Sequence, residues 1–228
     1  LTYGGIGLRD LYIEQGIAKI NILFRHIRAN DNLAKIILIN LEWTQLLCGT
    51  SQPILEKTSL KITYVRNWFM DIPDFLQHIG GSITIGETYQ PHKLLRQHDN
   101  FIMEKMIEYT SSNTTLETLN RVRIWMKIAT LAEISTEDGL SIERKFWIGD
   151  QNKETTIIWP HQSKPDHRAF SLWRKFLSIT FLLDSETKAT AKRKDLELNI
   201  PLGPWFHHAR KTFRRYKDFF SPQSELVY

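Results

Sequence analysis

Basic and aromatic side chains alternate between Trp205 and Phe220, near the end of the chain. Lysine and arginine neutralise phosphate groups and aromatic rings stack on nucleobases, so this composition fits binding to nucleic acid. A second interpretation stays open, in which an amphipathic segment packs its rings on a core while its charges face water. The candidate nucleic-acid-binding residues of this segment are Arg210, Lys211, Arg214, Arg215 and Lys217.

A second candidate surface lies in residues 121–128, where polar and apolar residues alternate strictly. Such alternation is typical of a strand, and a strand would place Arg121, Arg123 and Lys127 on one basic face. Residues 114–117 form a capping-box pattern, however, and the helix that it begins could continue through the segment. Both interpretations are kept. The three basic residues are predicted to contact nucleic acid, with an ordinary polar outer face as the alternative.

Metal-dependent chemistry on phosphates needs at least two carboxylates held close together. The sequence has no Asp-Asp step. Asp138 followed by Gly139 could begin the metal-binding strand of a nuclease, but a simple turn explains the same pair. The histidines lack metal-site spacing on a helix, and Cys48 is the single cysteine, which excludes a disulfide within the chain. We therefore expect no catalytic residue, no metal site and no cofactor.

The composition indicates a folded chain with a moderate basic excess. Among 228 residues, 42% are hydrophobic, and the formal net charge of +5 weakly favours polyanions as partners. No apolar run approaches the ~18 residues that cross a membrane, and no signal peptide is recognisable. The chain begins at Leu1 without a methionine, which suggests a fragment of a longer reading frame. We expect an intracellular protein, nuclear or cytoplasmic, with no membrane partner.

Apolar residues recur at helical spacing in the first part of the chain. This spacing predicts a helix over residues 11–29 and a second from Leu33 to Cys48, with Asn30 and Asp31 at the turn and Gly49 as the terminator. Because the connection is short, the two helices are expected to pack antiparallel. The second helix is apolar around most of its circumference, which places it near the centre of the core.

Further helices are predicted over residues 74–79, 99–109 and 167–183, and a brief strand over residues 82–89. The fold class is therefore mainly α with minor β: a helical bundle-like core with a short strand pair and a loop-rich basic C-terminal tail. A domain boundary is expected near residue 166. It would separate residues 1–166 from a helix and basic aromatic tail at 167–228, although a single domain remains an alternative.

Several blocks of the sequence, taken in order, resemble the region that follows the thumb in the reverse transcriptases of LINE-like retrotransposons, which lack long terminal repeats, of the type found in algae such as diatoms. The resemblance spans nearly the whole chain. It departs from the family at Phe219-Phe220-Ser221-Pro222, where such elements tend to have an aromatic pair followed by Asp-Pro. The matching blocks are Gly4-Gly5-Ile6-Gly7-Leu8-Arg9-Asp10-Leu11, Glu14-Gln15-Gly16-Ile17-Ala18 with Arg25-His26, Pro53-Ile54-Leu55-Glu56, Arg121-Val122-Arg123, Trp173-Arg174-Lys175 and Pro201-Leu202-Gly203-Pro204-Trp205.

The resemblance implies a parent RNA-directed DNA polymerase whose catalytic aspartates lie upstream of this chain. It leaves open an RNase H module downstream. The chain itself would be a non-catalytic fragment that contacts RNA and DNA through their backbones and packs on the upstream polymerase domain. Two alternatives are kept: a helical protein-interaction module without nucleic-acid binding, and a free-standing metal hydrolase that depends on Asp138.

Overall fold

The computed structural model of the chain describes residues 10–56, 62, 64–85, 92–155, 157–183 and 196–206. Within these ranges it contains seven α-helices and one short 3₁₀-helix, which confirms the prediction of a mainly α fold. The predicted strand pair is not shown, because the described β-contacts are five isolated bridges. Residues 82–85 of the predicted 82–89 strand have no regular structure, and residues 86–89 lie outside the described ranges.

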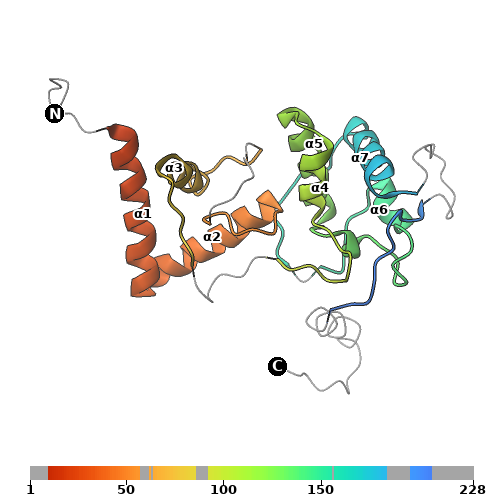
Figure 1. Cartoon of the computed structure of the whole chain (residues 1–228), viewed down its shortest axis with the longest axis horizontal. Helices are drawn as coiled ribbons and strands as arrows, with labels where there is room; N and C mark the ends of the chain where they lie inside the picture. Colours follow the sequence, from red (N-terminus) through yellow and green to blue (C-terminus); the bar gives the residue numbers. More distant parts are fainter. Residues whose placement is uncertain are drawn as a thin grey trace, which may run out of the picture. The chain divides into compact units, whose positions relative to one another are not determined.

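The chain divides into two compact units (Figure 1). Unit 1 consists of Leu1–Cys48 and Gln52–Pro91, and unit 2 of Gly49–Ser51 and His92–Tyr228. The division differs from the expected boundary near residue 166. The helix that begins at His167 packs on other helices of unit 2, so it does not start a separate domain.

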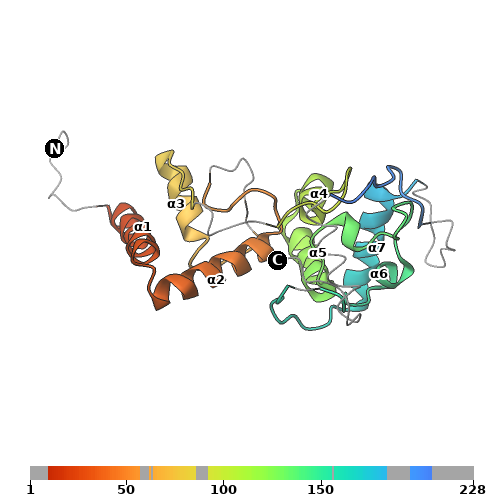
Figure 2. The same cartoon turned by 90° about the horizontal axis from the view of Figure 1, so that it is seen from below.

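Unit 1 begins with α1 (Leu11–Ala29) and α2 (Asn32–Cys48), which have nearly the predicted bounds. Asn30 ends α1 in the left-handed conformation, and the Asp31 carboxylate accepts a hydrogen bond from the Ala34 amide at 2.8 Å, which caps α2. Figures 1 and 2 show the two helices diverging from this turn. The expected antiparallel alignment along their lengths is therefore wrong.

Only one face of α2 is buried within the described structure. That face carries Ala34, Ile37, Leu41 and Cys48, whereas Ile36 and Ile39 on the other side are each 54% exposed. In Figure 2, α1 and α3 (Asp71–Ile79) lie on the same side of α2. The sequence-based expectation that α2 lies at the centre of the core is wrong, because an all-round apolar helix can still lack a partner on one face.

The α1–α3 contact of unit 1 depends on a glycine. A Cβ atom built on Gly16 would lie 2.3 Å from the ring of Phe75, which is itself 3% exposed. The absence of a side chain at this point of α1 lets the Phe75 ring lie directly against the helix backbone. A residue without a Cβ atom, glycine, is therefore required where α1 and α3 touch.

Unit 2 packs its helices around an aromatic core. Trp173 and Phe176 of the last helix are fully buried, and the Phe176 ring meets Tyr109 edge-on with centroids 5.4 Å apart. The Trp173 indole N–H donates to the backbone oxygen of Phe146 at 3.0 Å. The elements of this unit are α4 (Ile102–Tyr109), α5 (Asn113–Met126), η1 (Leu131–Glu133), α6 (Arg144–Ile148) and α7 (His167–Phe181).

None of the helices in the described ranges is long and apolar enough to span a membrane.

Candidate nucleic-acid interface

Residues 121–128 form the end of a helix and its cap. Helix α5 begins after Ser112, whose side chain accepts from the Thr115 amide, and it continues to Met126. Lys127 then adopts the left-handed conformation with φ 59°. The helical interpretation of this segment is confirmed, and the strand with one basic face is wrong. On a helix, Arg121 and Arg123 point about 200° apart, so they cannot share a surface.

Arg123 is a core residue with an exposed fraction of 0%. Its guanidinium donates to the Asn120 side-chain oxygen at 2.9 Å and to the Ile128 backbone oxygen at 3.3 Å, and it lies 5.6 Å from the Trp159 ring centroid. These contacts hold the charge inside unit 2 and leave no surface for a phosphate. The prediction that Arg123 contacts nucleic acid is therefore wrong.

The two neighbouring candidates remain at the surface to different degrees. Arg121 is exposed on the outer side of α5, whereas Lys127 is half-buried at the helix end. Neither of them forms an ion pair with a residue in the described ranges. The Arg121 side chain is therefore accessible to a phosphate group, and that of Lys127 is accessible only in part.

The five basic residues predicted in the tail, Arg210, Lys211, Arg214, Arg215 and Lys217, lie outside the described residues. The segment that precedes them is anchored to unit 2. Trp205 is half-buried with its ring 4.8 Å from the Arg96 guanidinium, and the Phe206 amide donates to the Leu95 oxygen at 3.0 Å. The Trp205 ring is thus already stacked within the protein.

A basic face on α7 escaped the sequence analysis. Arg168 and Lys175 are exposed and Arg174 is half-buried, and α7 contains no acidic residue. None of these three forms an ion pair with a described residue. Arg168, Ser171 and Lys175 are separated by three and four residues, which puts them on one side of the helix, opposite the buried Trp173 and Leu177. The sequence contained this signal, because helical spacing alone places Arg168 and Lys175 on one side of the predicted 167–183 helix.

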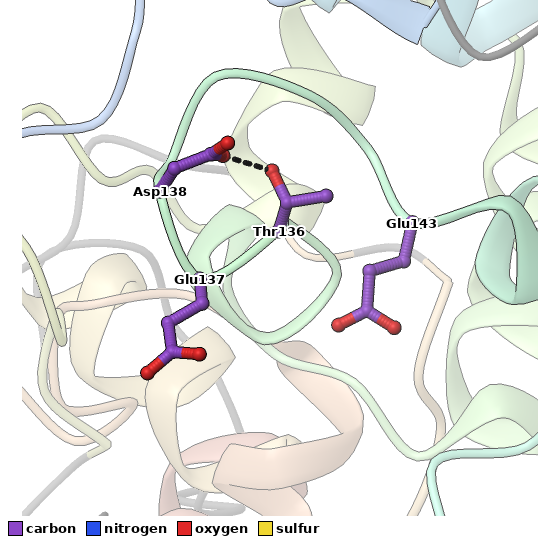
Figure 3. A pocket seen from close by; sticks show the side chains of 4 residues that line it. All are labelled: Thr136, Glu137, Asp138 and Glu143. Carbon is purple, nitrogen blue, oxygen red and sulfur yellow. Dashed lines mark hydrogen bonds between the residues drawn. The ribbon is translucent and has the colours of Figure 1, made fainter.

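Asp138 lies in a tight turn at a shallow hollow lined by Thr136, Glu137 and Glu143 (Figure 3). Its carboxylate accepts from the Thr136 hydroxyl at 2.5 Å and from the Leu140 amide at 3.0 Å. Figure 3 shows the Glu137 side chain pointing away from that of Asp138, and Glu143 pairs with Lys145 at 2.7 Å. No group of three or more potential metal ligands occurs within the ranges that the structure describes. The turn interpretation of Asp138-Gly139 is confirmed.

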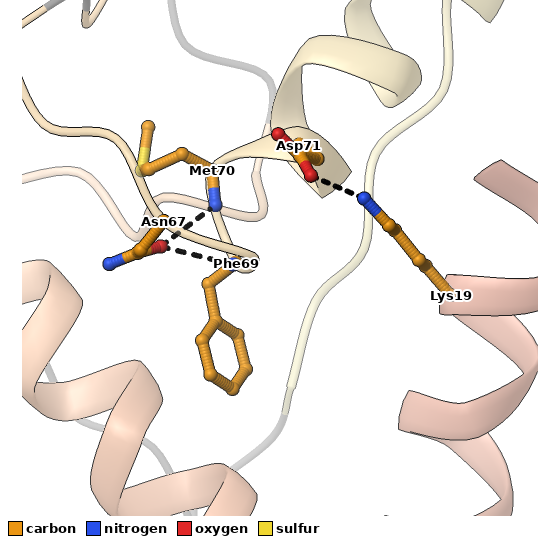
Figure 4. Close-up of polar contacts among 5 residues, drawn as sticks. All are labelled: Lys19, Asn67, Phe69, Met70 and Asp71. Carbon is orange, nitrogen blue, oxygen red and sulfur yellow. Dashed lines mark hydrogen bonds and ion pairs between the residues drawn. The ribbon is translucent and has the colours of Figure 1, made fainter. Parts of the chain in front are cut away.

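Polar side chains also gather at the start of α3 in unit 1 (Figure 4). The Asn67 side-chain oxygen accepts from the amides of Phe69 and Met70 at 3.0 and 3.2 Å, and the buried Lys19 of α1 pairs with Asp71. All of these groups serve to begin α3 and to attach it to α1. The cluster is structural rather than a ligand site.

A buried polar network joins the loops of unit 2. Arg96 donates to the backbone oxygens of Gly203 and Glu137 at 2.8 and 3.1 Å, which ties the C-terminal described segment to the Asp138 turn. Asp99 accepts from the amides of Leu95 and Ala132 at 2.9 and 2.8 Å. Burial raises the pKa of the Asp99 carboxyl, against the lowering effect of these backbone hydrogen bonds, and burial lowers the pKa of Arg96. Both groups are occupied in holding loops together.

Comparisons with known proteins give no family for the chain: no family model matches it, and neither a curated protein nor a solved structure matches it.

Proposed function

We propose that this chain is a non-catalytic part of a retroelement reverse transcriptase and that it contacts nucleic acid through phosphates. The sequence resemblance to the region after the thumb of LINE-like enzymes motivates the parent activity. The contact role is supported by exposed basic side chains of unit 2 that form no ion pair with a described residue. Together these features give a polyanion-binding accessory segment whose polymerase domain lies elsewhere in the parent protein.

The observation that carries the contact role is the α7 face with Arg168 and Lys175, which we call the α7 basic face. A surface cation without an ion-pair partner can approach a phosphate without first breaking an internal bond. Such contacts position a duplex but do not read its sequence. Binding should therefore be independent of sequence and strongly dependent on salt.

The test is a fluorescence-anisotropy titration of a labelled RNA–DNA hybrid at several salt concentrations. Three variants are compared with the parent chain. One is the double variant Arg168→Ala, Lys175→Ala; the second is the single variant Arg121→Ala; the third is the triple variant Arg210→Ala, Arg214→Ala, Arg215→Ala. Loss of two phosphate contacts should lower the magnitude of the log–log salt slope by about 1.4 to 1.8. Arg25→Ala, which removes an exposed cation of α1 in unit 1, is the matched control. Binding that does not respond to salt or to any of the basic variants would reject the proposal.

A second candidate function is a helical protein-interaction module. The exposed apolar residues of α2 favour it, because contiguous apolar surface often marks a binding site for another protein. Pull-down of partners that persists after nuclease treatment, and that depends on apolar rather than basic residues, would favour this candidate over nucleic-acid binding.

A further inference from the structure

The outward side of α2 carries a row of apolar side chains with coiled-coil spacing. Ile36, Ile39 and Trp43 follow each other at intervals of three and four residues, and each is between 42% and 54% exposed. Such intervals place side chains along one seam of a helix. The opposite side of α2 is buried within unit 1. The helix therefore has one face packed in its own unit and a second apolar face, which we call the α2 seam, open to a partner.

The charged residues of α2 are arranged so that those of one copy of the helix can pair with those of a second copy. Lys35 and Glu42 are the only charged residues of the helix, both are exposed, and neither forms an ion pair with a described residue. They are seven residues apart, and each immediately precedes a seam residue, Ile36 or Trp43. Both charges therefore lie on the same flank of the seam. The other flank carries Leu33, Asn40 and Leu47, which are uncharged.

This arrangement fits a second copy of the same helix in the antiparallel direction. A two-fold axis across an antiparallel helix pair brings each flank against the same flank of the other copy, with the chain direction reversed. Lys35 then faces Glu42 of the second copy, and Glu42 faces its Lys35. Within the seam, Ile36 packs against Ile39 of the second copy. A parallel pair would instead oppose the charged flank to the uncharged one and would form neither ion pair.

We infer that α2 mediates self-association of the chain as an antiparallel helix pair, with the α2 seam as its apolar centre and Lys35 and Glu42 as its flanking ion pairs. The inference does not depend on nucleic-acid binding. One helix face is smaller than a standard protein–protein interface, so the dimer should be weak and should dissociate on dilution.

Sedimentation velocity of the full chain over a wide concentration range, after nuclease treatment, tests the inference. The parent chain should move from monomer to dimer as its concentration rises. Lys35→Glu and Glu42→Lys, each alone, place like charges opposite each other and should each weaken the dimer by about tenfold or more. The double variant with both changes restores opposite charges and should regain the dimer.

A mixture of the two single variants sharpens the test. The Lys35→Glu chain carries only acidic flank charges and the Glu42→Lys chain only basic ones, so the mixture should form a heterodimer although each alone associates poorly. Arg25→Glu, an exposed charge change on α1, is the control and should leave association unchanged. Circular dichroism checks that each variant is folded.

Three results would overturn the inference. The first is a chain that stays monomeric at all concentrations. The second is a dimer that neither charge reversal weakens. The third is a double variant, Ile36→Ser with Ile39→Ser, whose thermal stability falls while its association state does not change. That result would mean that another part of the same chain covers the α2 seam.

Discussion

Helices α2 in unit 1 and α7 in unit 2 have similar lengths, and each buries one apolar face, but their open faces differ in chemistry. The open face of α2 is apolar with one charge of each sign, whereas that of α7 is basic and contains no acidic residue. The buried faces explain why both segments are helical. The open faces differ in what they can bind: an apolar, charge-balanced face suits a copy of itself, and a face whose charges are all positive suits a polyanion.

The largest expected effect comes from Arg123, which belongs to the interior of unit 2 rather than to its basic surface. Arg123→Ala removes a fully buried side chain and leaves the Asn120 and Ile128 oxygens without these donors, so unfolding should become easier by about 3 kcal/mol or more. Urea denaturation followed by tryptophan fluorescence measures the change.

The neighbouring exposed position supplies the control for this prediction. Arg121→Ala should change the free energy of unfolding by no more than about 0.5 kcal/mol, as surface substitutions usually do. Equal effects of the two substitutions would contradict the distinction between a core arginine and a surface arginine in α5.

The next effect concerns the packing of unit 1. Gly16→Ala should destabilise the α1–α3 contact by about 1 to 3 kcal/mol, because the added methyl group meets the buried Phe75 ring. At an exposed helix position the same change would instead stabilise by roughly 0.5 to 1 kcal/mol. Hydrogen exchange should speed up in α1 and α3 and stay the same in α5 and α7. Slower exchange in α1 would show that the methyl group is accommodated.

The smallest effects are those of pH, and they have opposite signs in the two units. In unit 1, the hydrogen bond from His26 lowers the pKa of the half-buried Asp31 below its ordinary value of 3.8. The stability that Asp31 contributes is therefore present above that value and is lost as the pH falls through the folded-state pKa. In unit 2, burial raises the pKa of Asp99 above 3.8. Its contribution is therefore largest below that value and is lost as the pH rises through the folded-state pKa.

Carboxyl titrations followed by NMR would measure these two shifts. Asp31→Asn and Asp99→Asn should each remove the pH dependence assigned to that residue and leave the other in place. Two titrations shifted in the same direction would contradict the contrast between the half-buried, histidine-bonded carboxylate of Asp31 and the buried carboxylate of Asp99.

The sequence predicted the local features of the fold well and the environment of its faces poorly. The turn at Asn30 and Asp31, the end of α2 at Gly49 and the bounds of α1 were predictable, because capping and helical spacing depend on residues close in sequence. The open side of α2 was not, since an apolar helix looks the same whether one face or two have partners within the chain.

The candidate interface shows the same limit. The alternation in residues 121–128 suggested a strand. The same eight residues also fit the end of a helix that buries one arginine, so the pattern alone does not decide between the two. Burial of Arg123 depends on Asn120 and on Trp159, and the second of these is distant in sequence. The α7 basic face, by contrast, needed only the helical projection of residues 168–175.

Nucleic-acid contact through α7 is tested most directly by one titration of an RNA–DNA hybrid with two charge-reversed chains measured side by side. Arg168→Glu with Lys175→Glu alters the α7 basic face, and Lys35→Glu alters the flank of the α2 seam. We expect the first chain to lose most of its affinity for the hybrid and the second to bind as the parent chain does at concentrations where all are monomeric. Equal affinity of both chains, or loss caused by the α2 change alone, would contradict the assignment of nucleic-acid contact to α7.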